Sequence, residues 1–471
     1  MDIEDIKKAS DIVWEQSVLP PLKEYITIPA ISPAYDKSWE QNGYLLKAAQ
    51  LIETWCRQLG LNGCDIRLIT PQGRTPLLLI DVQASDTKHT DMVLFYGHID
   101  KQPEFSGWDD NKGPWKPVIE NGRLYGRGGA DDAYSVFCAM SAIKILQDKG
   151  LPHERCVLLI ESAEESGSFD LDYYLDEYQG IIGAPSLVIC LDSGCGDYER
   201  MWLTTSLRGG IFGVLTVKIL TDGIHSGGSG AVASSFRIMR QLLDRIEDAE
   251  TGDILIDELH APVPEHRLEQ MKVAAQVLGE DIITAFPLVD GATPVTDDRV
   301  QLLINQTWKP TLSYTGIDGV PALEKAGNVL RPKTSLALSF RLSPTADPQK
   351  ASRKIKSVLE ADPPYGAHVT FESPKTGNGW EMPELDPVLD RIIRQSGLDC
   401  YGREVGFLGE GGGIPLMNML SKRFPKARFI VTGVLGPHSN AHGPNEFLHI
   451  PFVKTLTSTV ACILSRRCGT H

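Results

Sequence analysis

Apolar runs and polar stretches alternate regularly along the first part of the chain. Nearly continuous apolar runs, typical of strands covered by helices on both faces of a sheet, lie at 77–82, 92–96, 156–160 and 186–191. Between them, notably at 1–60 and 132–149, apolar residues recur every three or four positions, which indicates amphipathic helices. Strands that alternate with helices predict an α/β fold with a mostly parallel sheet covered by helices.

The pattern changes after about residue 205 and changes back near residue 376. Three strands are expected in the intervening part, at 211–219, 335–342 and 368–372. They surround a less regular, proline-containing segment, which is typical of an α+β unit. A further apolar strand at 428–435 and a closing helix continue the first pattern. We therefore expect one domain formed by residues 1–206 and 376–471, with residues 207–375 inserted as a second, α+β domain.

The composition is that of a globular protein and argues against several classes of partner. Of the 471 residues, 42% are hydrophobic and 23% are charged, and a chain of this length needs more than one core. The formal net charge of -15 argues against nucleic acid and membrane surfaces as partners. No apolar run has the length of a membrane span. Nine scattered cysteines without a CxxC pair and a charged N-terminus without a secretion signal predict a cytoplasmic protein.

Acidic and histidine residues lie directly after the predicted strands, where ligands of α/β sheets bind. Three of the first four strands are followed by such residues: His98, Glu164 with Glu165, and Asp192. Asp131 lies in a glycine-rich turn, Gly126–Asp132, ahead of a predicted helix. Taken alone, this turn is equally compatible with an acidic helix cap. The Glu-Glu pair could likewise be two solvated acids, and a lone histidine is usually a surface residue.

Together these residues predict a metal centre. With a histidine from a late loop, the candidate ligands are two imidazoles and three carboxylates, His98, Asp131, Glu165, Asp192 and His442. This set suits zinc or a similar first-row metal, with Mn2+ and Co2+ as alternatives to Zn2+. Five ligands exceed the need of one tetrahedral zinc, so we expect two divalent metal ions with Asp131 as the bridge. Asp100, two residues after His98, is the expected partner for the second ring nitrogen of His98. Of the adjacent Glu164 and Glu165, one can bind a metal while the other takes the proton of a water molecule.

Five short segments carry a resemblance to a known family. YGHID, GRGGADD, ESAEESGS, LDSG and AHGPNE resemble, in order and approximate spacing, the metal-site motifs of the M20 family of dizinc peptidases. The tryptophan-containing loop after His98 and the segment GEGGGIP resemble its cytosolic non-specific dipeptidase and carnosinase branch. The resemblance implies a zinc-binding α/β domain with an inserted lid and dimerisation domain, and hence a homodimer.

The resemblance also implies a division of the metal ligands. His98 and Asp192 would hold one metal, Glu165 and His442 the other, and Asp131 would bridge them. Glu164 would act as the general base, and Asp100 would support His98. The peptide bond between Asp131 and Asp132 corresponds to one that is cis in the family.

Four further residues are implied to touch the substrate. His225, in GIHSGG, resembles a histidine that reaches into the partner subunit's active site and stabilises the oxyanion. Arg341, in FRLSP, resembles an arginine that binds the substrate carboxylate. Asn328 lies where a polar lid residue touches the substrate, and Glu410 resembles an acid that receives the free amine. Without the resemblance, each could be an ordinary surface or turn residue.

We therefore expect hydrolysis of dipeptides or short peptides with a free C-terminal carboxylate. An N-acyl amino acid deacylase or amidohydrolase on the same scaffold would use the same metal motifs. A non-catalytic binding protein is the third alternative, against which Glu164 argues because a binding site needs no base. Gly409 and Gly413 replace an arginine and a serine that are common in the dipeptidase branch, which leaves the side-chain preference open.

Overall fold

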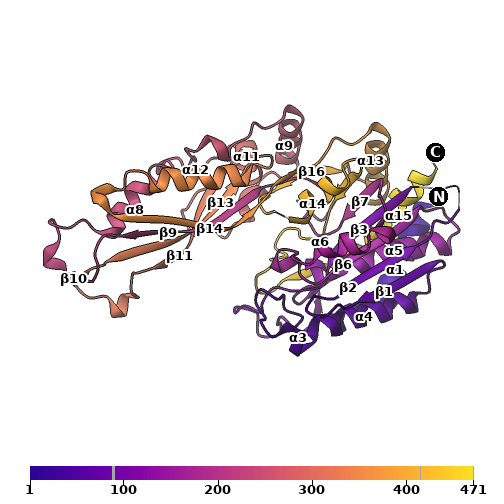
Figure 1. The fold of residues 1–471 in the computed structure, drawn as a ribbon. Helices are drawn as coiled ribbons and strands as arrows, with labels where there is room; N and C mark the ends of the chain where they lie inside the picture. Colours follow the sequence, from indigo (N-terminus) through magenta and orange to yellow (C-terminus); the bar gives the residue numbers. More distant parts are fainter. Residues whose placement is uncertain (87, 89–90, 414, 470–471) are drawn as a thin grey trace.

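The computed structural model describes residues 1–86, 88, 91–413 and 415–469. Ile414, in the segment GEGGGIP, lies outside the described residues. Two lobes are visible in Figure 1. One is built around a six-stranded sheet and carries both termini, and the other is an elongated lobe formed by the middle of the chain.

The six-stranded sheet has the strand order β1-β2-β6-β3-β7-β17. Its strands are β1 (Cys64–Ile69), β2 (Leu77–Val82), β3 (Met92–His98), β6 (Arg155–Glu161), β7 (Leu187–Cys190) and β17 (Arg428–Val431). The strands β6, β3, β7 and β17 pair in parallel, whereas β2 runs antiparallel to β1 and β6. The predicted α/β class with a mostly parallel sheet is therefore confirmed.

Helices cover both faces of this sheet, which explains the continuous apolar runs. Along β3, Val93 and Phe95 point into one hydrophobic cluster, and Leu94 and Tyr96 point into another. The first cluster lies under α1 (Ile3–Val13), α4 (Tyr44–Leu59), α5 (Tyr134–Asp148) and α15 (Ile450–Cys468). The second lies under α6 (Leu171–Glu177) and α14 (Pro415–Arg423).

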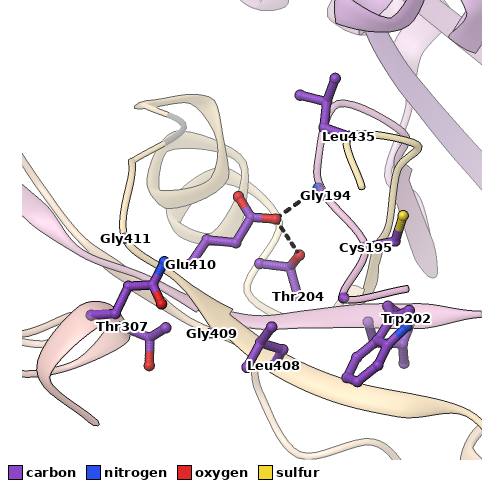
Figure 2. Close-up of a pocket in the computed structure, with 13 residues that line it drawn as sticks. Gly194, Cys195, Trp202, Thr204, Thr307, Leu408, Gly409, Glu410, Gly411 and Leu435 are labelled. Atoms are coloured by element: carbon purple, nitrogen blue, oxygen red, sulfur yellow. Dashed lines mark hydrogen bonds between the residues drawn. The ribbon is translucent and has the colours of Figure 1, made fainter. Parts of the chain in front are cut away.

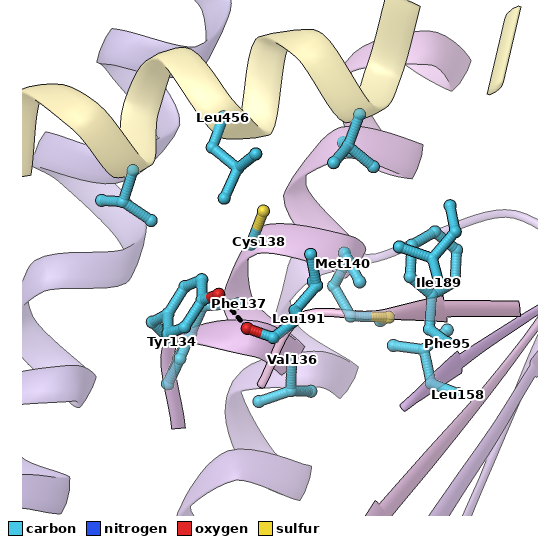
Figure 3. Packing of buried hydrophobic residues seen from close by; sticks show 14 of the residues in the cluster. Phe95, Tyr134, Val136, Phe137, Cys138, Met140, Leu158, Ile189, Leu191 and Leu456 are labelled. Atoms are coloured by element: carbon cyan, nitrogen blue, oxygen red, sulfur yellow. Dashed lines mark hydrogen bonds between the residues drawn. The ribbon is translucent and has the colours of Figure 1, made fainter. Parts of the chain in front are cut away.

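The helix α5 lies at the centre of the larger cluster. Figure 3 shows Phe137 and Cys138 of α5 between Leu456 of α15 and the strand residues Phe95 and Ile189. Phe137 also packs on Trp55 of α4, with 4.5 Å between the ring centroids. Buried aromatic and aliphatic side chains of this size contribute a few kcal/mol each on burial. This packing holds α5, and with it the glycine-rich turn that precedes it, against the sheet.

The elongated lobe contains a four-stranded antiparallel sheet of order β11-β13-β9-β14. Its strands are β9 (Gly209–Lys218), β11 (Thr311–Asp318), β13 (Lys333–Leu342) and β14 (His368–Gly377). One face packs against α8 (Ser235–Leu243) and α12 (Pro348–Glu360). The opposite face carries Phe212, Val214 and Arg341, all at least partly exposed. The strands β10 (Ile224–His225) and β12 (Val329–Leu330) pair at the far tip of this lobe (Figure 1).

A small three-stranded sheet where the lobes meet was not predicted. It consists of β15 (Trp380–Glu381), β8 (Trp202–Leu207) and β16 (Gly406–Glu410). Because β16 extends through Glu410, the first two residues of the segment GEGGGIP, Gly409 and Glu410, lie in a strand. Gly409 fits in this strand because a Cβ there would lie 2.5 Å from the Ser206 hydroxyl. The helices α9 (Glu265–Leu278), α10 (Asp281–Thr284) and α11 (Arg299–Thr307) lie in the segment that the sequence pattern left irregular, and α9 and α11 pack on β16.

Some predicted boundaries differ from the structure. The strand expected at 428–435 ends at Val431 of β17. The predicted helical region 1–60 also contains α2 (Leu19–Ile26) and α3 (Trp39–Asn42) as separate helices. The remaining elements are β4 (Val118–Glu120), β5 (Arg123–Tyr125), α7 (Gln179–Ile182), α13 (Pro387–Tyr401) and β18 (Phe447–His449). Within the described part of the chain, every helix is too short or too polar to span a lipid bilayer.

Candidate active site

The carboxyl edge of the six-stranded sheet carries the predicted metal ligands. β3 ends at His98, and Asp192 lies just beyond the end of β7. Glu164 and Glu165 follow β6 in a short helical turn. Because these strands are parallel neighbours, their carboxyl ends meet at one edge. The structure brings all five candidate ligands together there, His98, Asp131, Glu165, Asp192 and His442.

Asp131 lies between the two histidines. Its Oδ1 is 3.3 Å from His98 Nε2, and its Oδ2 is 3.0 Å from His442 Nε2. Asp192 Oδ1 lies 3.7 Å from the same nitrogen of His98, and Glu165 Oε1 lies 3.5 Å from His442 Nε2. The two oxygens of the Asp131 carboxylate therefore lie near different imidazoles. Each imidazole has one further acid near it, Asp192 for His98 and Glu165 for His442.

The potential ligand atoms form two groups. In one, atoms of His98, Glu164 and Asp192 lie within 4.8 Å of one another, and in the other the atoms of Asp131, Glu165 and His442 do so. Glu164 is thus close enough to the first group to be a ligand as well as a base. Its role as general base stays a prediction.

The buried nitrogen of His98 fits a metal ion. His98 is fully buried, and its Nε2 has no hydrogen-bond partner among the described residues, although two carboxylates lie nearby. An unsatisfied buried polar atom costs free energy. An imidazole nitrogen surrounded by carboxylate oxygens is a donor set that zinc, manganese and cobalt accept.

Asp100 connects His98 to the loop that carries Glu164 and Glu165. Its Oδ1 lies 3.3 Å from His98 Nδ1, and its carbonyl oxygen lies 3.2 Å from the same nitrogen. Its two carboxylate oxygens accept hydrogen bonds from the backbone N–H groups of Glu164, at 3.1 Å, and Glu165, at 3.0 Å. These contacts orient the ring of His98 so that Nε2 faces the acids.

The glycine-rich turn holds Asp131 in place. Gly128 has a φ of 82°, and a Cβ at this position would lie 2.8 Å from the side chain of Lys101, so only glycine fits. The peptide bond between Asp131 and Asp132 is cis, as the resemblance implied. Asp132 is fully buried, and its Oδ2 accepts a hydrogen bond of 3.2 Å from the backbone N–H of His98. Asp131 therefore points at the metal centre while Asp132 holds the turn to β3.

Comparison with known protein families decides where this site belongs. The chain matches the peptidase family M20/M25/M40 over residues 94–466, which includes every candidate ligand. The chain belongs to peptidase family M20. This M20 peptidase is therefore a hydrolase of a metal-dependent family, and the class predicted from the sequence motifs is confirmed.

Dipeptidases are among its relatives. This M20 peptidase is 27% identical over 363 residues to the cysteinylglycine-S-conjugate dipeptidase of Corynebacterium striatum. The aligned region covers 75% of this chain and 76% of the relative. It is 26% identical over 428 residues to the Cys-Gly metallodipeptidase DUG1 of Saccharomyces cerevisiae, and the aligned region covers 84% of each protein. Its fold resembles a solved structure of the yeast di-peptidase Dug1p, with a TM-score of 0.79, 24% identity and coverage of 100% of this chain and 99% of that one. Human carnosine dipeptidase 1 has a TM-score of 0.76, 19% identity and 98% coverage of both chains.

The metal centre of this M20 peptidase is strongly acidic. Burial, together with the charge of Asp131, raises the pKa of Glu165 to about 8, and burial raises the pKa of Glu164 well above its usual range. Burial also opposes the charged forms of Asp131 and His442, but their mutual attraction holds the pKa of Asp131 well below its usual range and raises that of His442 to about 9. A site in which buried acids lack enough positive charge favours bound cations.

His225 and Asn328 do not join this cluster within one chain. His225 is exposed in β10, and Asn328 accepts a 2.9 Å hydrogen bond from the backbone N–H of Ser226 beside it. Both lie at the tip of the elongated lobe, at the opposite end from the six-stranded sheet (Figure 1). Contact with an active site would therefore require a second subunit.

Glu410 contacts the two residues that follow the candidate metal ligand Asp192. Its Oε1 accepts hydrogen bonds from Ser193 Oγ at 2.8 Å, Gly194 N at 2.7 Å and Thr204 Oγ1 at 3.1 Å. Ser193 and Gly194 directly follow Asp192 in the chain. Figure 2 shows this carboxylate oxygen directed at Gly194 and Thr204, in a cavity of about 280 Å³. Glu410 is therefore anchored in the wall of a cavity beside the metal centre.

Arg341 lies on β13, on the partly exposed face of the four-stranded sheet, with its guanidinium 5.8 Å from the ring centroid of Phe212. No ion pair of Arg341 is found among the described residues. Its position on the lobe surface leaves the guanidinium open to an anionic group.

Sequence reasoning missed three residues that support the ligands. Gln102 donates a hydrogen bond to Glu165 Oε2. Arg127 and Glu446 form a buried ion pair between two ligand-bearing segments. All three lie in or beside the motif segments quoted above, and this position was the only indication in the sequence that they belong to the site. Their pairing across the chain was not visible in any local pattern.

Proposed function

We propose that this M20 peptidase hydrolyses dipeptides or short peptides with a free C-terminal carboxylate, using two divalent metal ions. The observation that carries the proposal is the position of Asp131, with one oxygen 3.3 Å from His98 and the other 3.0 Å from His442. His98 with Asp192 would hold one metal and His442 with Glu165 the other. When bound, the metals polarise the scissile carbonyl and lower the pKa of a water molecule. Zinc is the first expectation, and manganese and cobalt suit the same donors.

Glu164 is proposed as the general base. It removes a proton from the attacking water and delivers it to the leaving amine. Burial raises the pKa of Glu164 above its usual range, which supports this role because it makes the carboxylate a stronger base. The Asp100 carboxylate supports it as well, because it holds the backbone of Glu164 and Glu165 in a fixed turn.

Other residues are proposed to bind the substrate. Arg341 receives the C-terminal carboxylate, for which a planar guanidinium offers two parallel hydrogen bonds. Glu410 receives the free amine. His225 and Asn328 act in the partner subunit's active site, His225 by donating to the oxyanion. In this proposal residues 207–375 are the lid and dimerisation domain of a homodimer.

The two relatives from Corynebacterium striatum and Saccharomyces cerevisiae support dipeptides as substrates, because both are named as dipeptidases. We further propose that the enzyme works in a reducing compartment such as the cytoplasm. Its nine cysteines are free thiols, and seven of them are buried.

Activity against a substrate panel tests the proposal. Protein stripped with a chelator and reloaded with zinc, manganese or cobalt is assayed with dipeptides and with N-acetyl amino acids. Hydrolysis of dipeptides that chelation removes and metal restores is the expected result. A clear preference for N-acetyl amino acids, which lack a free amine, would instead identify a deacylase and remove the role given to Glu410.

A further inference from the structure

Arg208 is a buried cation whose hydrogen bonds with the described residues all go to neutral acceptors. It lies where the lobes join, between β8 and β9, and is 8% exposed. Its Nη1 donates to the carbonyl oxygens of Asn305 at 3.3 Å and Lys309 at 3.0 Å and to Thr311 Oγ1 at 3.2 Å. Its Nε donates to the carbonyl oxygen of Gly411 at 3.1 Å. All of these acceptors are neutral, and within the described part of the chain Arg208 forms no ion pair.

A second guanidinium lies beside the same threonine. Thr311 of β11 is the direct cross-strand partner of Arg341 of β13, so their side chains lie on the same face of the sheet and close together. The positive charge of Arg341 and, more strongly, burial lower the pKa of Arg208 to about 10. Two cations that share a neighbour and form no ion pair with the described residues favour an anionic group of a ligand.

Arg208 and Thr311 also form part of the wall of an apolar cavity. The cavity has a volume of about 280 Å³, and its apolar lining includes Ile282, Ile283, Phe286, Leu288, Val295 and Leu302. Its rim is open, since Leu288 is 45% exposed. An uncovered apolar cavity with a cation in its wall suits an anion that carries an apolar group.

This cavity adjoins the one that contains Glu410. Gln306 lines both, and Gly411, whose carbonyl accepts from Arg208, directly follows Glu410. The contacts therefore connect the segment after the candidate ligand Asp192 to the carboxylate of Glu410, then to Arg208 and the apolar cavity. A dipeptide carries three groups of matching chemistry, its amine, its C-terminal carboxylate and its C-terminal side chain.

We propose that the apolar cavity receives the side chain of the substrate's C-terminal residue, while Arg208 shares that residue's carboxylate with Arg341. This inference rests on the proposed function and narrows it to peptides that end in an apolar residue such as leucine or phenylalanine. C-terminal glycine has no side chain to fill the cavity, and C-terminal aspartate places a charge against apolar walls.

Steady-state kinetics of the metal-loaded full-length protein test the specificity. We expect kcat/KM for Ala-Leu and Ala-Phe to exceed that for Ala-Gly at least about tenfold, as apolar pockets commonly discriminate. Leu288→Glu, at the open rim of the cavity, lowers the Ala-Leu to Ala-Gly ratio about tenfold. Leu288→Lys raises relative activity toward Ala-Asp, a gain that damage to the fold cannot produce. Equal activity toward all C-terminal residues, or an unchanged ratio in both variants, overturns the inference.

Val289→Glu is the matched control. Val289 follows Leu288 in the same loop and is 77% exposed but does not line the cavity. If the cavity determines the specificity, Val289→Glu keeps the wild-type ratio of kcat/KM for Ala-Leu to that for Ala-Gly. A ratio lowered equally by Val289→Glu would show a general effect of negative charge on this loop and would also overturn the inference.

A binding measurement separates this inference from the proposed function. N-acetyl-L-leucine and N-acetylglycine both offer the carboxylate, and only the former offers an apolar side chain. Calorimetry on the chelator-treated protein, which cannot hydrolyse either probe through bound metal, should show at least about tenfold tighter binding of N-acetyl-L-leucine. This result would keep the cavity assignment even if no dipeptide were hydrolysed. Equal or undetectable binding of both probes would overturn it even if dipeptidase activity were found.

Discussion

Arg127 and Glu446 form a buried ion pair that joins the turn carrying Asp131 to the loop carrying His442. Glu446 Oε1 also accepts a 2.8 Å hydrogen bond from the backbone N–H of Gly128. Arg127 Nη2 donates to a backbone carbonyl of the loop that carries His442, at 2.9 Å. The pair therefore sets the separation of two proposed ligands of the same metal, and no hydrogen bond from it to His98 or Asp192 is found among the described residues.

Glu446→Gln should weaken one metal site more than the other. The substitution keeps the shape of the side chain but leaves the charge of Arg127 buried and uncompensated. We expect affinity at the site of Asp131, Glu165 and His442 to fall about 10–100-fold, the usual effect of losing such a supporting contact. Metal titration against a competing chelator measures the two sites separately.

Asp81→Asn provides the control for this prediction. Asp81 pairs with Arg155 at 2.9 Å near the other edge of the sheet, away from the metal centre. Its loss should leave both metal affinities near the wild-type values. Equal weakening of both sites by Glu446→Gln would mean that the ion pair supports the fold generally and does not position one site.

Glu164→Gln should abolish most of the activity and retain the metals. Loss of a general base commonly lowers kcat about 10²–10⁴-fold, whereas the proposed ligands do not include Glu164. Kinetics and metal analysis on the same preparation measure both quantities. Because Glu164 lies within the His98 and Asp192 group, a loss of one metal per chain would instead identify it as a ligand.

Metal binding should release protons at neutral pH. Burial raises the pKa of Glu165 to about 8, and nearby carboxylates, against the opposing effect of burial, raise the pKa of His442 to about 9. Both groups are therefore largely protonated in the metal-free protein at pH 7 and must lose the proton to bind a metal. Calorimetry in buffers of different ionisation enthalpy counts the released protons. Fewer protons should be released at pH 9, and no release at pH 7 would contradict the prediction.

The same groups determine how the stability of the metal-free protein changes with pH. Their pKa values in the folded state exceed the unfolded values of about 4.3 for Glu and 6.5 for His, so the folded chain binds more protons than the unfolded chain. Their stabilisation is complete at low pH and is lost as pH rises through about 8 and 9. We expect the Tm difference between metal-loaded and metal-free protein to widen from pH 6 to pH 9. A constant difference would show that these groups do not titrate as described.

Mixing two inactive variants should restore activity if His225 acts across subunits. His225→Ala removes the proposed oxyanion donor, which commonly costs about 10²–10³-fold in kcat, and Glu164→Gln removes the base. A mixed dimer would have one complete site, because the Glu164→Gln subunit supplies His225 to its partner. Random reassortment should yield about a quarter of the wild-type activity. No recovery after proven subunit exchange, or an active monomer on gel filtration, would show that His225 does not act in a partner.

The sequence alone was sufficient for five of the six strands of the main sheet, all except β1, and for the five candidate ligands. Strands buried on two faces must be continuously apolar, so β3, β6 and β7 could be located without knowing their neighbours. Parallel strands end at a common edge, so the residues that follow them, such as His98 and Asp192, could be expected to meet. These inferences depend only on local burial and on a general rule of sheet topology.

Tertiary structure alone decided which residues are partners over long separations. The sequence does not show that Arg127 pairs with Glu446, that Asp131 directs one oxygen to each histidine, or that Arg208 lies beside Arg341. The short strands β8 and β16 were missed because glycine and mixed polar residues mask their pattern, and close packing on a neighbour makes glycine fit at Gly409. Local periodicity reports which side of an element is buried, but it contains no information on what covers that side. Contacts between distant segments are decided by the packing of the whole chain.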